Sequence, residues 1–144
     1  MGMITDKDRF WLSIAFKIGS RSKAIKRHVG AIIVMDDRPI SIGYNGTPKG
    51  WDNTCETRLP DGTMETKPEV LHAESNAIAF LARRGSVGAK GTTIYVSYPP
   101  CLECAKLIHQ AGISRVVCAR ETKTPAGIQF LKKAKILIVH VKDW

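Results

Sequence analysis

Two short segments carry residue types that could hold and use a metal ion. They are His72–Glu74, which reads His-Ala-Glu, and Pro100–Cys104, which reads Pro-Cys-Leu-Glu-Cys. One histidine and two cysteines make three zinc ligands, and three protein ligands with an open position are typical of a catalytic zinc rather than a structural one. We therefore predict zinc binding by His72, Cys101 and Cys104. Glu74 is predicted to carry protons for a reaction in which activated water is the nucleophile.

The cysteines also allow two other interpretations. Cys55 or Cys118 could complete a closed structural zinc site, and a C-x-x-C segment can be redox-active. A closed site would leave Glu74 without a role, and Cys118 falls inside a predicted strand. The histidine and glutamate upstream of the C-x-x-C segment disfavour the redox interpretation.

Both segments are expected to stand at the starts of helices. A helix over residues 72–84 follows a long loop at residues 45–70, and a second helix over 101–111 follows Pro99-Pro100. Free N–H groups and the positive end of the helix dipole at such positions favour the thiolate form of cysteine. The i, i+3 spacing of Cys101 and Cys104 places both sulfur atoms on one side of the first turn.

The remaining pattern alternates helices and strands. A Thr5–Asp8 capping box opens a helix that ends at Gly19, and residues 36–39 form the turn of a hairpin between strands at 29–35 and 40–44. Further strands are expected at 92–97, 116–118 and 136–141, with a helix over about 126–135. This order predicts an α/β fold with a mixed sheet and helices on both of its faces. The 28 residues between His72 and Cys101 suffice for a crossover that brings the two helix starts together.

Length and charge limit the class of protein. The 144 residues are expected to form a single domain over 1–144, and we expect no membrane association, because no apolar run has the length of a membrane span. The cytoplasm, or the host cytoplasm for a viral protein, is the expected location. A net charge of +9, from 22 Lys and Arg against 13 Asp and Glu, suits a phosphorylated partner, although basic solvated surfaces are also common.

With these residues in place, the chain resembles the cytidine deaminase-like superfamily and, more closely, the family of deoxycytidylate (dCMP) deaminases, phage members included. The matching motifs are G-Y-N-G-x-P-x-G, H-A-E-x-N-A-I and P-C-x-x-C-A-K followed by Q-A-G-I. The resemblance runs from about Phe10 to the last strand and is carried by Gly43–Gly50, Leu71–Ile78, Pro100–Ile113, Arg21–Lys23 and Val29–Ala31.

The resemblance implies a three-layer α/β/α fold around a central mixed five-stranded sheet. It implies a hydrolase acting on cyclic amidines, which deaminates dCMP to dUMP and ammonia and feeds thymidylate synthesis. Zinc would lie at the three ligands above, and Glu74 would shuttle protons. Asn45 and the backbone of Ala73 would bind the nucleoside, and Ser22 and Lys26 would bind its 5′-phosphate.

The family also suggests regulation and assembly. Members are commonly homohexamers built from dimers, activated by dCTP and inhibited by dTTP, and Mg²⁺ would accompany the regulatory nucleotide. Gly43, Tyr44 and Gly46 belong to the loop associated with that nucleotide. A glycine-rich loop can cradle phosphates, but glycines also serve tight turns, so the residues alone leave both interpretations open.

Two rivals and two departures complete the comparison. A tRNA or other nucleic-acid deaminase usually shows D-P-T-A-H-A-E, whereas Pro68–Leu71 precede His72 here. A non-enzymatic zinc module that binds nucleic acid would be indifferent to Glu74, and we expect no stable nucleic-acid partner.

Pro99 removes a backbone N–H that many members have beside P-C-x-x-C, and Ala119–Thr122 contain no aromatic residue where many members place one.

Overall fold

The computed structural model describes residues 2–85 and 87–144. Its central sheet has five strands in the order β2-β1-β5-β6-β7. Strand β1 is antiparallel to both of its neighbours, whereas β5, β6 and β7 are mutually parallel. The sheet strands are β1 (Gly30–Met35), β2 (Arg38–Tyr44), β5 (Thr93–Val96), β6 (Arg115–Ala119) and β7 (Leu137–Val141).

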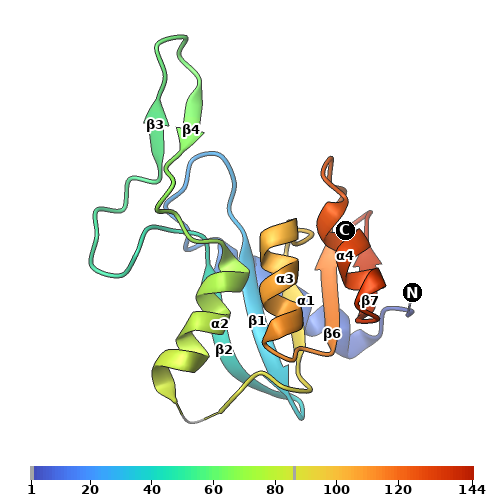
Figure 1. The fold of residues 1–144 in the computed structure, drawn as a ribbon. Helices are drawn as coiled ribbons and strands as arrows, with labels where there is room; N and C mark the ends of the chain where they lie inside the picture. Colours follow the sequence, from blue (N-terminus) through green and yellow to red (C-terminus); the bar gives the residue numbers. More distant parts are fainter. Residues whose placement is uncertain (1, 86) are drawn as a thin grey trace.

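Helices cover both faces of this sheet (Figure 1). Helix α1 packs on one face, where Leu12 and Ala15 join Ile32, Val117 and other strand residues. The other three helices pack on the opposite face. The helices are α1 (Asp6–Gly19), α2 (Ala73–Arg84), α3 (Leu102–Gln110) and α4 (Ala126–Lys133). The predicted three-layer arrangement with a mixed five-stranded sheet is confirmed.

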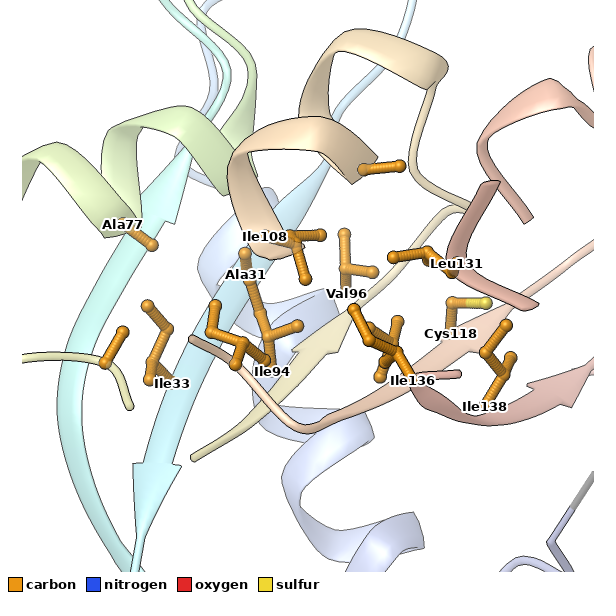
Figure 2. Close-up of a cluster of buried hydrophobic side chains, with 14 of the residues drawn as sticks. Ala31, Ile33, Ala77, Ile94, Val96, Ile108, Cys118, Leu131, Ile136 and Ile138 are labelled. Carbon is orange, nitrogen blue, oxygen red and sulfur yellow. The ribbon is translucent and has the colours of Figure 1, made fainter. Parts of the chain in front are cut away.

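The larger core lies under the three helices that share a face. Figure 2 shows Ala77, Ile108 and Leu131 pointing from these helices toward strand residues such as Ile94 and Val96. Cys118 of β6 is part of this core and is fully buried. Alternate residues of β1, β5, β6 and β7 enter the two cores, since successive side chains of a strand point to opposite faces.

Two local structures agree with the prediction from sequence: the N-terminal cap of α1 and the turn between β1 and β2. Thr5 and Asp8 form the reciprocal hydrogen bonds of a capping box, each 3.1 Å long, at the start of α1. Asp36 and Asp37 both adopt positive φ, 48° and 59°, in the two-residue turn between β1 and β2. Aspartate tolerates this conformation and such turns suit a tight hairpin.

One expectation was wrong in detail. The segment expected as a loop over residues 45–70 contains an antiparallel hairpin of β3 (Glu56–Arg58) and β4 (Met64–Thr66). Figure 1 shows this hairpin projecting away from the main sheet. Each strand has three residues and lacks a run of alternating apolar side chains, so the pattern that identifies longer strands is absent there.

No helix within the described ranges, 2–85 and 87–144, has the length and apolar character needed to cross a membrane.

Candidate active site

The site lies along the edge of the sheet that is formed by strand ends, where β1 begins and where β2 and β5 end. The Ser97 backbone N–H donates to the Gly30 carbonyl at 3.0 Å, which ties the end of β5 to the start of β1. Residues just outside the strands therefore gather at this edge. Val29, Asn45 and Tyr98 all line a cavity of about 280 Å³ there.

The two metal-binding segments meet at this edge. The Nδ1 atom of His72 lies 3.5 Å from the Cys101 sulfur and 3.3 Å from the Cys104 sulfur. All three candidate ligand atoms lie within 4.8 Å of one another. A tetrahedral zinc with bonds of about 2.3 Å to sulfur and about 2.0 Å to nitrogen separates these atoms by about 3.5 Å. The residues present therefore fit zinc, with His72 using Nδ1.

Helix starts position the ligands, as predicted. His72 is the N-cap residue of α2, and Cys101 is the N-cap residue of α3. Hydrogen bonds from Cys104 and from His72 lower the pKa of Cys101 to about 3. The pKa of Cys104 is raised, first because its thiol donates to Cys101 and then because it is buried. The hydrogen bond with Cys101 also raises the pKa of His72.

Glu74 lies two residues into α2 and only 4 % of its surface is exposed. Removal from water raises the pKa of its carboxyl group to about 7. It lines the same cavity as His72 and Cys101. A carboxyl group in this place can accept and return a proton near neutral pH.

The predicted fourth-ligand candidates lie elsewhere. Among the described residues, the His/Cys/Asp/Glu group that could hold a metal comprises His72, Cys101 and Cys104, without Cys55 or Cys118. Burial raises the pKa of Cys118 to about 12, so it stays a neutral core thiol. Three ligands beside an open cavity fit a catalytic metal better than a closed structural one.

Three of the four predicted substrate-binding residues line the cavity: Asn45, Ala73 and Lys26. The Asn45 side chain is fixed by the backbone, because its Oδ1 accepts from the Val29 N–H at 2.9 Å and its Nδ2 donates to the Arg27 carbonyl at 2.8 Å. One amide hydrogen and one acceptor lone pair are left over for a ligand. Asn45 therefore also holds the segment that carries Lys26 and Arg27.

Ser22 is not among the residues that line the cavity. It is buried, and its hydroxyl group donates to the Asn45 carbonyl at 2.8 Å and accepts from the Ala24 N–H at 3.2 Å. These contacts fasten the segment after α1 to the end of β2. In this structure Ser22 supports cavity residues and does not face the cavity.

Three residues of the glycine-rich motif make structural contacts, and two of them, Gly43 and Tyr44, lie in β2. A Cβ atom on Gly43 would overlap the Ala73 carbonyl and come within 2.6 Å of the Ala77 nitrogen, so this glycine lets β2 lie directly against α2. Gly46 exchanges two backbone hydrogen bonds with Leu71, 3.1 and 2.8 Å long. Tyr44 accepts a hydrogen bond from Asn76 through its carbonyl at 2.8 Å. The motif thus anchors the start of α2.

Sequence reasoning missed several cavity residues. The Arg27 guanidinium lies 3.9 Å from the centre of the Tyr98 ring, and both residues line the cavity. Pro99, which the sequence had already singled out beside P-C-x-x-C, lines it too. Glu56, which is buried, and Thr124 line it as well. None belongs to a motif with a sequence signature, and Glu56 lies in the hairpin that was expected to be loop. The excess of basic residues near 17–27 was the one available signal for Arg27.

This fold and this cluster define the class of zinc-dependent hydrolases whose site combines one histidine, two cysteines and a proton-carrying glutamate. Residues 5–120 match the family model of the cytidine and deoxycytidylate deaminase zinc-binding region, and the chain belongs to this family. The chain is accordingly a deaminase, as the resemblance implied.

The relatives that this chain matches include proteins named as deoxycytidylate deaminases. The deoxycytidylate deaminase of Enterobacteria phage T4 is 32% identical over 90% of this chain and 87% of its own length. The human deoxycytidylate deaminase is 42% identical over 75% of this chain, and the match spans 61% of the human protein. A dCMP deaminase from the cyanophage S-TIM5, crystallised with dCMP and dUMP, superposes with a TM-score of 0.87 at 32% identity, covering 97% of this chain and all (100%) of that one.

Proposed function

We propose that the protein is a dCMP deaminase, which converts dCMP and water to dUMP and ammonia, and that residues 1–144 act as one domain. The observation that carries the proposal is one cavity lined by His72, Glu74 and Cys101 and also by the cations Lys26 and Arg27. Cations beside a hydrolytic centre suit a ligand that carries both a base and a phosphate. Relatives named as deoxycytidylate deaminases support the same substrate.

The chain's own residues account for orientation and proton transfer. When bound by His72, Cys101 and Cys104, zinc would supply an activated water as the nucleophile. The oxygen of that water would bond to the amine-bearing ring carbon, and Glu74 would take up the two water protons in turn, delivering one to the ring nitrogen and one to the departing amine. The bond between the amine and the ring carbon breaks, and the carbon keeps the oxygen. Asn45 and the Ala73 backbone orient the nucleoside.

The phosphate-binding role falls on the segment that Asn45 holds. Lys26 offers a point charge, and the Arg27 guanidinium offers a planar fork for phosphate oxygens. Stacking on Tyr98 restrains Arg27 on the cavity wall. Ser22 acts indirectly, through its hydrogen bonds to Asn45 and Ala24.

The test replaces Glu74 with glutamine. Glu74→Gln keeps the shape of the side chain but removes the proton carrier, so kcat for dCMP should fall by a factor of about 10² to 10⁴ while bound zinc is retained. Ammonia release measures turnover, and elemental analysis measures zinc.

A matched control is available on the other helix. Glu103 stands two residues after Cys101, as Glu74 stands two residues after His72, but Glu103 is exposed and pairs with Lys106 at 3.0 Å. Glu103→Gln should leave turnover unchanged. Undiminished turnover in Glu74→Gln, or failure of the unaltered protein to release ammonia from dCMP, would contradict the proposal.

Regulation, assembly and location are further parts of the proposal. We propose that dCTP activates and dTTP inhibits a homohexamer built from dimers in the cytoplasm, with Mg²⁺ accompanying the regulatory nucleotide. The intact Gly43–Gly50 motif, which the family associates with the regulatory nucleotide, supports the regulatory part of this proposal.

A further inference from the structure

Glu56 is a buried carboxylate that the chemistry above leaves unused. It begins β3, is 5 % exposed, and lines the cavity. Among the described residues, the side-chain ion pairs within 4.0 Å join Lys7 to Asp37, Lys106 to Glu103 and Arg115 to Asp8, so Glu56 has no cationic partner. Burying a charge without a partner is costly unless hydrogen bonds compensate for it.

Hydrogen bonds compensate one of its two oxygen atoms. Oε2 accepts from the backbone N–H of Ile25 at 2.9 Å and from that of Lys26 at 3.1 Å. These bonds fix the carboxylate rigidly in place beside the segment that carries the cavity's cations.

The second oxygen atom, Oε1, has no hydrogen bond from any residue that the structure describes. Over the same described residues, no side-chain oxygen is both sealed from solvent and unpaired. Oε1 is therefore open to solvent, and Glu56 is one of the residues that line the cavity. The cavity wall thus presents a fixed, charged acceptor with free lone pairs.

The group of the ligand that can contact Oε1 must be a hydrogen-bond donor. An ionised carboxylate only accepts hydrogen bonds, so it repels a phosphate and attracts a hydroxyl or amine group. Deoxycytidylate has two such donor groups, the exocyclic amine of its base and the 3′-hydroxyl of its sugar. The amine must face the metal ligands and Glu74 in order to react. The 3′-hydroxyl is the donor that remains for Glu56.

We propose that Glu56 is a specificity-determining residue whose free oxygen accepts a hydrogen bond from the 3′-hydroxyl of the nucleotide. The inference rests on the proposed function and extends it. Inside a nucleic-acid strand the 3′ oxygen is esterified, so it has no proton to donate and it brings a negative phosphodiester toward the carboxylate. Glu56 therefore selects free mononucleotides and rejects nucleotides within a strand.

A substrate–variant cycle tests this role. The kcat/KM values of the unaltered protein and of Glu56→Gln are measured on dCMP and on 2′,3′-dideoxycytidine 5′-monophosphate, which lacks the hydroxyl. Glutamine can still accept the two backbone N–H groups, so the fold of the segment is kept. Because a hydrogen bond to a charged group contributes about tenfold or more, the unaltered protein should prefer dCMP by that factor, and Glu56→Gln should lose most of the preference.

Controls separate this role from a structural one. Glu65→Gln changes an exposed residue of the same hairpin and should keep the full preference for dCMP. A 5′-phosphorylated dinucleotide with cytosine first should be a poor substrate of the unaltered protein and a relatively better one for Glu56→Gln.

Equal losses on dCMP and on the dideoxy nucleotide would show that Glu56 only supports the fold, and so would overturn this inference while leaving the proposed function intact. Efficient turnover of the dinucleotide by the unaltered protein would overturn it too. Absence of turnover on dCMP itself would overturn the proposed function, and the inference with it.

Discussion

Two sulfur atoms and one imidazole nitrogen within 4.8 Å of one another are the smallest unit on which the chemistry depends. Removing one sulfur should release the metal, because serine is a poor zinc ligand at neutral pH. We expect Cys104→Ser to lose most of its zinc, measured by elemental analysis.

Cys118 provides the matched control. Cys118→Ala removes a buried sulfur that lies outside the cluster, so zinc content should stay near one ion per chain while the free energy of unfolding falls by about 1 kcal/mol. Loss of zinc in Cys118→Ala but not in Cys104→Ser would show that the ligand assignment is wrong.

The roles of individual residues could be predicted from the sequence where their types and spacing are specific to one kind of chemistry. His72, Glu74, Cys101 and Cys104 follow a pattern that few other functions need, and the structure brings them together. Ser22 and Glu56 had no such pattern. Their roles depend on hydrogen bonds to residues 23 and 31 positions away, which no local signal encodes.

Close contact between β2 and α2 holds the start of α2, where His72 and Glu74 lie. Gly43 permits that contact, since any side chain there would strike the backbone of Ala73 and Ala77. Gly43→Ala should therefore lower the free energy of unfolding by about 1–3 kcal/mol and weaken zinc binding.

Gly46→Ala is the control for this prediction. Gly46 belongs to the same motif, but a Cβ atom there would meet no atom within 4 Å. Chemical denaturation and zinc titration of both variants check the expectation. Equal destabilisation by the two substitutions would mean that the motif matters through something other than packing.

The elements were predictable in proportion to their apolar content. Strands of the main sheet contain runs of buried apolar residues such as Ala31–Val34, most of them β-branched, and Gly or Pro marks several helix boundaries. The β3–β4 hairpin has mostly polar, exposed side chains and three-residue strands, so its formation depends on tertiary contacts. One of these contacts is that of Glu56 with the backbone of Ile25 and Lys26.

Across the whole molecule, Asp8 ties α1 to the sheet. Arg115 of β6 donates two hydrogen bonds to its carboxylate, 2.8 and 2.7 Å long, and Tyr95 of β5 donates a third at 3.0 Å. Burial acts to raise the pKa of Asp8, but the hydrogen bonds from Arg115, Thr5 and Tyr95 outweigh it and lower the pKa to about 2. Sequence separations of 87 and 107 residues put these partners beyond local prediction.

This network predicts acid sensitivity. An aspartate in the unfolded chain has a pKa of about 3.9, so the ionised Asp8 contributes about 2–3 kcal/mol above that pH and loses it as the pH falls toward about 2. In Asp8→Asn the contribution is absent at every pH. The difference in free energy of unfolding between the two proteins should shrink by about 2 kcal/mol between pH 6 and pH 2.5. Parallel pH profiles would contradict this assignment.

The two helix starts at the metal cluster are occupied by residues that suit catalysis better than folding. Neither His72 nor Cys101 makes the side-chain hydrogen bond that an N-cap residue normally supplies. Serine, threonine or aspartate there would stabilise each helix by about 1 kcal/mol. Natural selection for a more stable metal-free chain and selection for turnover therefore oppose each other at positions 72 and 101. A more heat-stable variant therefore has to gain its folding stability at other positions in the molecule.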